Sequence, residues 1–172
     1  LAFCLSLSSF AKTNEIGENI DVTHYEIHLN TIDFTDRVLE ASAILTLTTK
    51  TEINALEFEL KSMEVTSVVC DACDVADYSQ DGDVLSITFA SNIAADTDLE
   101  ITINYGGSTF NENWGGVHWS ADYVYNLGVG FDSQPHNLGK TWYPCVDNFS
   151  DKASYDLYIT IPEAMTSSCG GI

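Results

Sequence analysis

Positive charge is scarce in this sequence. The 172 residues include 6 Lys and Arg against 26 Asp and Glu, which gives a formal net charge of -20. A surface with this balance repels the phosphate backbone of nucleic acids and anionic lipid head groups. The composition therefore argues against nucleic acid and membrane surfaces as partners. The acidic residues are spread through alternating apolar segments, which is typical of solvated strand faces.

Several catalytic motifs are missing as well. The sequence contains no Gly-x-Ser-x-Gly nucleophile elbow, no phosphate-binding loop and no Gly-rich dinucleotide fingerprint. His24 and His28 flank a Glu, but a zinc peptidase motif requires that Glu directly after the first His. On a strand these two His lie about 13 Å apart, whereas zinc requires bonds of about 2 Å. We therefore expect no metal site and no catalytic residue in this chain.

Helical periodicity is also absent, and a period of two takes its place. Apolar and polar residues alternate in six segments, separated by turn residues such as those at 80–83 and 106–107. Short strands at regular spacing predict an all-β fold of packed antiparallel sheets. The hydrophobic content of 45% suits one medium-sized domain. The expected strands cover residues 24–30, 39–48, 56–60, 85–89, 99–105 and 155–161.

Residues 106–150 differ from the rest because they are rich in Gly, Asn and aromatic residues. Long loops of this kind in a β domain are often functional. The alternative is that most of these rings only fix the loops over the sheet edges. The rings in question are Trp114, Trp119, Tyr123, Tyr125, Phe131, Trp142 and Tyr143.

The first residues are typical of an export signal. Residues 1–11 form an apolar run that is too short to span a bilayer and ends in Ser9-Phe10-Ala11, with small residues where signal peptidase cleaves. Cys4 follows the bulky Phe3, which disfavours a lipoprotein signal. We expect a signal peptide remnant at 1–11, a leader at 12–20, a β domain at 21–172, and a periplasmic or secreted protein. A buried first strand is the alternative for residues 1–11.

Cys70 and Cys73 enclose two residues among short β-type runs. An exported protein tolerates disulfides, so a structural bridge across a tight turn is one interpretation. Free thiols remain an alternative. A redox or metal role is the third, although the redox motif begins a helix and a zinc site needs two further ligands.

The most informative segment lies at 142–155 and reads Trp-Tyr-Pro-Cys-Val-Asp-Asn-Phe-Ser-Asp-Lys-Ala-Ser-Tyr, followed by a strand that ends in Pro162. This segment resembles the aromatic-Pro-Cys-x-Asp signature of aminopeptidase-N-like zinc metallopeptidases. Residues 21–27 resemble the family's opening strand, and residues 99–107 resemble the strand before its first long loop. The resemblance covers about residues 20–172 in the right order, which is more specific than any one motif.

The resemblance implies a saddle-like, β-sandwich N-terminal domain with long aromatic-rich loops, and a catalytic domain that is not part of this chain. The zinc, its ligands and the transition-state Tyr of the parent enzyme would all belong to that domain, so this chain alone should be inactive. Its implied partners are the missing catalytic domain and a peptide substrate. The family's N-terminal domain contributes a Gln to the first substrate pocket, and Gln134 is the candidate here. The usual Thr-Gln-x-Glu pattern is replaced by Ser-Gln-Pro-His, and the spacing to Pro144 is shifted by a residue.

Physical chemistry gives the signature a structural interpretation too. Pro144 ends the loop because it lacks an amide donor, and Cys145 is expected to be a small buried hydrophobe. Asp147, Asp151 and Lys152 are expected to bind turn backbone groups and one another. A stand-alone binding or scaffold module, presenting the 106–150 loops to protein or carbohydrate, is the competing functional interpretation.

Overall fold

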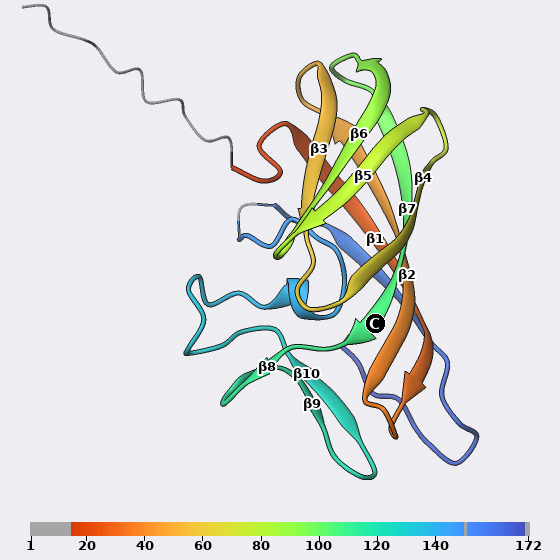
Figure 1. Cartoon of the computed structure of the whole chain (residues 1–172), viewed down its shortest axis with the longest axis vertical. Helices are drawn as coiled ribbons and strands as arrows, with labels where there is room; N and C mark the ends of the chain where they lie inside the picture. The colour runs from red at the N-terminus through yellow and green to blue at the C-terminus, as the bar shows by residue number, and fades with distance from the viewer. Residues whose placement is uncertain (1–14, 150, 171–172) are drawn as a thin grey trace, which may run out of the picture.

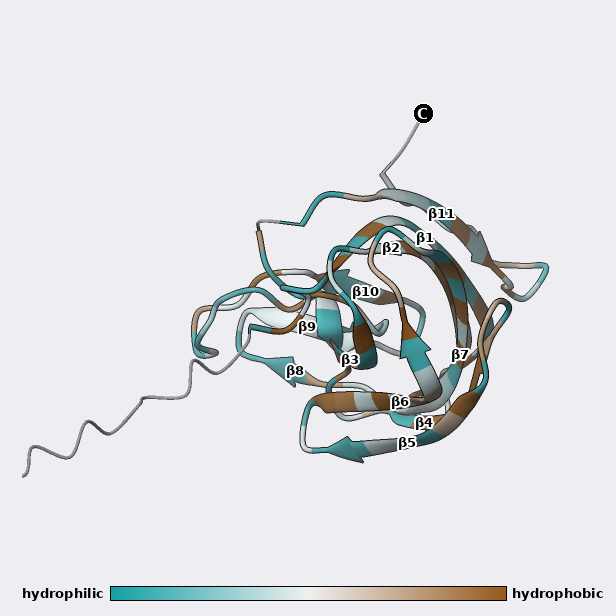
Figure 2. Ribbon diagram, turned by 90° about the horizontal axis from the view of Figure 1, so that it is seen from above, coloured by the Kyte–Doolittle hydropathy of each residue, from teal (hydrophilic) through white to brown (hydrophobic). Residues whose placement is uncertain are grey.

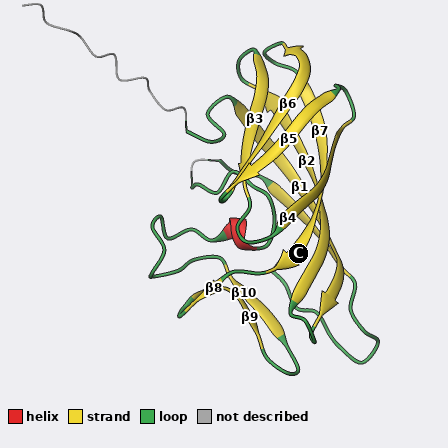
Figure 3. Ribbon diagram, in the orientation of Figure 1, coloured by secondary structure: helices red, strands yellow, loops and turns green. Residues whose placement is uncertain are grey.

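The computed structural model describes residues 15–149 and 151–170, and the expected signal remnant and the first three residues of the expected leader lie outside them. Strands dominate this part of the chain, and its one helical element is the short 3-10 helix η1 (Figure 3). The elements are β1 Ile20–Asp33, β2 Val38–Thr49, β3 Ile53–Glu59, β4 Glu64–Cys70, β5 Val75–Asp81, β6 Val84–Ile93, β7 Asp98–Ser108, β8 Asn111–Glu112, β9 Gly115–Trp119, β10 Val124–Leu127, η1 Gly139–Thr141 and β11 Ser154–Ile159. The all-β prediction is confirmed, and all six predicted strands are present.

The strands form three sheets. A five-stranded sheet has the order β11-β1-β2-β7-β4, and two three-stranded sheets have the orders β3-β6-β5 and β10-β9-β8. In Figure 1 the β3-β6-β5 sheet lies in the upper part of the molecule, the five-stranded sheet runs along its right side, and β8, β9 and β10 lie at the lower left. Seen from above, the five-stranded sheet curves around one side of this body (Figure 2). The five-stranded sheet and the β3-β6-β5 sheet thus enclose one apolar core.

Alternation along the strands builds that core. In β2 every second residue from Leu39 to Thr49 is buried, and the neighbouring strand β7 in the same sheet repeats the pattern. A strand exposes successive side chains to opposite faces, so a period of two places one whole set of apolar residues inward. The fully buried apolar side chains include Leu45, Leu47, Phe58, Leu85, Ile87, Ile101 and Ile103.

Strand β11 departs from the expected antiparallel arrangement. It pairs parallel to β1, with Tyr155 opposite Tyr25. Parallel neighbours need a long crossover between them, and here residues 34–153 provide it. The end of this connection is held to the body by two hydrogen bonds, from Glu59 N–H to the Cys145 carbonyl (2.8 Å) and from Cys145 N–H to the Glu59 carbonyl (3.0 Å).

The aromatic-rich region contains more regular structure than expected. Within residues 106–150, β8, β9 and β10 form a small antiparallel sheet, whose strands are two, five and four residues long. Strands this short leave little periodicity in the sequence, which is why the region was predicted as loops. The small sheet provides a base for the longer loop that follows it.

Candidate functional site

The loop at residues 128–138, between β10 and η1, carries Gln134 and projects away from the sheets on the left of Figure 1. Its two arms are joined by hydrogen bonds from Gly130 N–H to the His136 carbonyl and from Leu138 N–H to the Gly128 carbonyl, both 2.8 Å. Leu138 is fully buried at the base. The loop is therefore closed at its base and exposed at its tip.

Gln134 lies at that exposed tip. Its amide Nε2 is 3.2 Å from Nε2 of His136, and the peptide bond to Pro135 is cis. An exposed amide offers both a donor and an acceptor to a bound molecule. The structure thus places the predicted residue where a partner can reach it, and its role in binding remains a prediction.

Residues at the turn after β8 hold the tip from the side. Oε2 of Glu112 accepts the Ser133 hydroxyl (2.6 Å), and Oε1 accepts the Asp132 N–H (2.9 Å). Asn113 Nδ2 donates to Oδ2 of Asp132 (3.3 Å). The hydrogen bond from Ser133 is the main cause that lowers the pKa of Glu112. Sequence reasoning missed Glu112, because its partners are some twenty positions away and no local pattern marks them.

A buried charge cluster holds the base of the loop. Lys140 Nζ contacts Oε1 of Glu59 on β3 (2.5 Å) and Oδ2 of Asp147 (3.9 Å). The Asp147 carboxylate also accepts the N–H groups of Gly139 and Lys140, and Asn137 donates to the Asp147 carbonyl. The expected backbone role of Asp147 is confirmed, but its ionic partner is Lys140 rather than Lys152.

Burial and charge act in opposite directions on the pKa values of this cluster. Burial lowers the pKa of Lys140, but the hydrogen bond and charge of Glu59, together with Asp147, outweigh it and raise the pKa overall. Burial is the main cause that raises the pKa of Asp147. Lys140 therefore stays charged, and its charge compensates the two carboxylates of a largely enclosed group.

The aromatic-Pro-Cys segment packs into the body. Tyr143 and Tyr155 both contact Tyr25 of β1, with ring centroids 5.4 and 5.2 Å apart, and Val146 N–H donates to the Tyr25 hydroxyl (3.1 Å). Cys145 is only 2% exposed, and burial raises the pKa of its thiol. The prediction that Cys145 is a small buried hydrophobe agrees with these contacts, and the signature anchors the chain to the body.

The exposed aromatic rings fall into two groups. Trp114 stacks on Phe131 (6.0 Å between centroids), and Tyr125 stacks between His118 and Tyr123. The expectation that most rings fix the loops holds for Trp119, Trp142 and Tyr143, which are buried or half-buried. Trp114, Tyr123, Tyr125 and Phe131 are largely exposed, and their rings contribute to the loops only through the stacking contacts described above.

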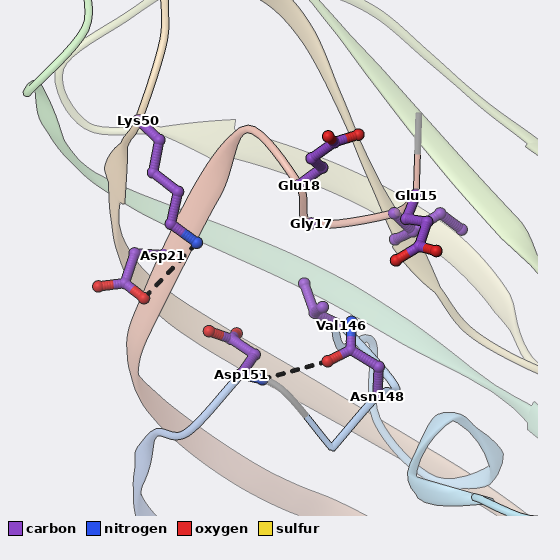
Figure 4. Close-up of a pocket in the computed structure, with 9 residues that line it drawn as sticks. Glu15, Gly17, Glu18, Asp21, Lys50, Val146, Asn148 and Asp151 are labelled. Carbon is purple, nitrogen blue, oxygen red and sulfur yellow. Dashed lines mark hydrogen bonds and ion pairs between the residues drawn. The ribbon is translucent and has the colours of Figure 1, made fainter. Parts of the chain in front are cut away.

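Two of the hollows away from this loop adjoin residues of the segment at 142–155. One is an apolar groove of about 730 Å³, lined by Leu29, Val117, Trp142, Leu157 and the segment 164–170. The other is smaller and polar, and Figure 4 shows it between the turn before β1 and residues 146–151.

Ionic and hydrogen-bonding contacts hold the polar hollow together. Lys50 Nζ is 3.8 Å from Asp21, and Asp151 N–H donates to Asn148 Oδ1 (3.1 Å). Burial is the main cause that raises the pKa of Asp151, and Lys50 opposes it. The expected local role of Asp151 in a turn agrees with these contacts.

The two strand histidines point to local partners. His24 Nδ1 lies 2.8 Å from the Ser154 hydroxyl, and His28 Nε2 lies 2.7 Å from Oε1 of Glu26. Within residues 15–149 and 151–170, no group of three or more His, Cys, Asp or Glu is arranged to hold a metal ion. In the same residues, no helix is long and apolar enough to cross a membrane.

Cys70, at the end of β4, and Cys73, in the turn before β5, form a disulfide in the structure, with their Cα atoms 5.4 Å apart. Cys145 and Cys169 are free thiols, the first buried and the second exposed. The bridge closes the turn between the five-stranded sheet and the β3-β6-β5 sheet, so its place in the fold is structural.

Fold and site together define a β domain that presents a braced polar loop beside exposed aromatic rings. Comparison with known protein families identifies the family of this domain. The chain belongs to the family of the peptidase M1 N-terminal domain, whose match covers residues 21–171. None of the curated proteins compared with this chain matches it.

Solved structures share the fold. The chain is similar to an M1 zinc metallopeptidase from Deinococcus radiodurans, with a TM-score of 0.71, 21% identity, and coverage of 85% of this chain and 33% of that one. A mutant of the M1 zinc metallopeptidase from Deinococcus radiodurans, bound to a Tyr-Ser-Ala substrate, aligns with a TM-score of 0.67 and 19% identity over 83% of this chain and 32% of that one. This chain thus spans about a third of the length of the structures it matches.

Proposed function

We propose that this chain is the non-catalytic N-terminal domain of an exported zinc aminopeptidase. In this proposal it packs against a catalytic domain and helps to shape the site where amino acids are removed from the N-termini of peptides. The family match over residues 21–171 carries the proposal, together with the share of the metallopeptidase structures that the chain spans. The remaining two thirds of such a protein would supply the chemistry.

Residues 15–149 and 151–170 do not fit a zinc site of their own. His24 and His28 lie on one strand and bind neighbouring side chains, and the described residues hold no ligand cluster. The zinc of the proposed parent enzyme would therefore be bound entirely by the other domain, and no step of the chemistry is assigned to this one.

Two surfaces support a domain partner. The rings of Trp114, Tyr123, Tyr125 and Phe131 are exposed, and the groove beside Trp142 is apolar. Aromatic side chains are enriched in the centres of protein interfaces, and exposed apolar patches often mark such interfaces. We assign these surfaces to contact with the catalytic domain.

Gln134 is the proposed contribution to the substrate site. It lies at the exposed tip of a loop that is held at its base and at its side. A braced loop loses little freedom when a ligand binds, so its amide can hydrogen-bond to a peptide at a low entropic cost. The amide would line the pocket for the first residue of the substrate.

A stand-alone binding module is the second candidate, and the exposed rings also favour it. Aromatic faces bind proteins and sugars in the absence of any catalytic partner. The two candidates differ in whether the same protein contains a zinc-binding catalytic domain. The peptidase function requires one, whereas a binding module requires neither a metal nor hydrolysis.

Sequencing the gene beyond Ile172 and assaying its whole product separates the two. The peptidase function predicts a His-Glu-x-x-His motif within about 200 further residues, a domain-sized span. It also predicts bound zinc and hydrolysis of aminoacyl chromogenic substrates by the longer protein, with neither in residues 12–172 alone. A longer protein without the motif, or without hydrolysis, would contradict the proposal.

Export is part of the same proposal, and the disulfide supports it because such bonds persist in oxidising compartments. Alkylation of the purified protein without reductant, followed by peptide mass mapping, should leave Cys70 and Cys73 unlabelled and label Cys169. Labelling of both Cys70 and Cys73 would contradict a stable bridge. The N-terminus of the exported protein should be Lys12.

A further inference from the structure

Three successive residues, at the end of β8 and in the turn after it, contact three successive residues of the loop at 128–138. The Glu112 carboxylate accepts the Ser133 hydroxyl, and the Asn113 amide donates to the Asp132 carboxylate. The Trp114 ring stacks on the Phe131 ring. We name this set of contacts between residues 112–114 and 131–133 the clasp. It ends one residue before Gln134, so it fixes the point from which that side chain extends.

Glu112 is the centre of the clasp. Its carboxylate accepts hydrogen bonds from two successive residues of the loop. Oε1 accepts the Asp132 N–H, and Oε2 accepts the Ser133 hydroxyl. Its strand β8 pairs with β9, with Glu112 opposite Gly115 and Asn111 opposite Gly116, so the carboxylate extends from a paired strand. Hydrogen bonds to an ionised acceptor are stronger than those to a neutral one.

The backbone of the loop is shaped to admit this carboxylate. A Cβ built on Gly130 would overlap the Glu112 carboxylate and would lie only 2.7 Å from Leu138. A side chain at position 130 would therefore displace Glu112 or open the loop. Gly130 and Glu112 form one fitted contact, whereas Gly128 in the same loop has nothing within 4 Å of its Cβ position.

We propose that Glu112 is a positioning residue, which fixes where Gln134 is presented by holding residues 131–133 in the clasp. The inference rests on the proposed function, in which Gln134 contacts the substrate. Glu112 itself touches no substrate in this account. Its carboxylate acts through Ser133 and the Asp132 amide, and the loop carries the effect to Gln134.

The test is NMR spectroscopy of this chain, with Glu112→Gln and Glu112→Ala as variants. We expect amide hydrogen exchange at Asp132 to become faster by on the order of tenfold or more in Glu112→Ala, which removes a hydrogen bond to a charged group. The increase should be smaller in Glu112→Gln, whose amide oxygen still offers one neutral acceptor. The side-chain amide signals of Gln134 should shift in both variants. Amides of β2 and β7 should keep their exchange rates, which shows that the body stays folded.

Glu57→Gln is the matched control, because Glu57, like Glu112, is a strand carboxylate that accepts a serine hydroxyl, here from Ser86 at 3.2 Å. This variant should leave the Gln134 signals unchanged. Gly130→Ala should reproduce the changes seen in Glu112→Ala through the overlap described above, whereas Gly128→Ala should have a smaller effect. These two variants test the clasp without changing the carboxylate.

Unchanged Gln134 signals in both Glu112 variants would overturn the inference, whatever the activity of the longer protein. The proposed function fails separately. If the Gln134 signals shift as expected but Gln134→Ala leaves kcat/KM of the longer protein unchanged, Glu112 positions the loop and the substrate role of Gln134 is wrong.

Discussion

The two regions of the molecule are held together by different interactions. The body, residues 20–108, buries alternating apolar side chains between curved sheets. The loop region, residues 109–153, is fixed at a few points by carboxylates, a buried lysine and stacked rings. The strands of the body are supported by many apolar contacts, whereas the loop at 128–138 is supported mainly by hydrogen bonds and ionic contacts at its base and side. The same substitution should therefore have different consequences in the two regions.

The largest difference is expected between two Phe→Ala substitutions. Phe58 on β3 is fully buried, whereas Phe131 in the loop is 71% exposed. Phe58→Ala should lower the free energy of unfolding by about 3–5 kcal/mol, because it leaves a cavity in a packed core. Phe131→Ala should change it by about 0.5 kcal/mol or less. Urea unfolding followed by circular dichroism measures both.

Similar losses of unfolding free energy in the two variants would contradict the distinction between the regions, because the loop region would then be as tightly packed as the body. If Phe58→Ala prevents folding altogether, Phe58→Leu tests the same site with a smaller cavity. It should still cost more than Phe131→Ala does.

A smaller effect is expected at the charge cluster that joins the regions. Lys140 is 10% exposed and compensates Glu59 and Asp147. Lys140→Met should cost about 2–3 kcal/mol, because it leaves buried carboxylates without their cation. Lys50→Met is the control, since Lys50 is 49% exposed in its pair with Asp21 and should cost about 0.5 kcal/mol or less.

Unfolding titrations of both Lys→Met variants give the comparison, and hydrogen exchange at residues 137–147 locates the damage. Equal costs at the two lysines would mean that the cluster does not anchor the loop. Faster exchange at the loop base in the Lys140 variant, with β2 and β7 unchanged, would sharpen the division between the two regions.

The body was predictable from sequence because its signal is local. Leu45, Leu47, Ile101 and Ile103 repeat every second position, and a pleated strand converts that period directly into a buried face. The parallel pairing of β11 was not predictable in this way. It depends on where a crossover of over a hundred residues returns, and periodicity contains no information about that.

The two regions should also lose stability at opposite ends of the pH scale. In the body and in the aromatic-Pro-Cys segment that packs on it, burial raises the pKa of Tyr25, Tyr105 and Tyr143 well above the usual range. The unfolded chain loses these protons above about pH 10, so stability should fall as the pH rises past that value. Urea titrations at pH 8 and pH 11 measure the loss.

In the loop, the pKa of Glu112 is lowered, so the stability that it contributes depends on pH in the opposite direction. Its stabilising contribution is complete above the unfolded pKa and is lost as the pH falls through the folded one. The clasp should therefore open in acid while the body stays folded, and the Gln134 side-chain NMR signals should report it. The raised pKa of Asp147 favours folding in acid, so the base of the loop should stay closed. An acid transition that affects β2 and the loop together would contradict this separation.

The candidate site was only partly predictable. Gln134 was found because a family resemblance identified its loop, and the aromatic-Pro-Cys segment was found because its residues are contiguous. Glu112 and the pair of Glu59 with Lys140 were missed, since the pair is 81 positions apart in sequence. Contacts of this kind arise only when the fold brings distant segments together, and a single sequence does not reveal them.

The central claim is that this domain lends Gln134 to the substrate site of a peptidase. The most direct test is the kcat/KM of the longer, zinc-loaded protein on aminoacyl substrates, comparing Gln134→Ala with Asn92→Ala, which removes an exposed amide on β6. The account predicts a loss of about tenfold or more for Gln134→Ala, the value of one hydrogen bond to a charged group. It predicts no change for Asn92→Ala. Equal kcat/KM in both variants would contradict the claim.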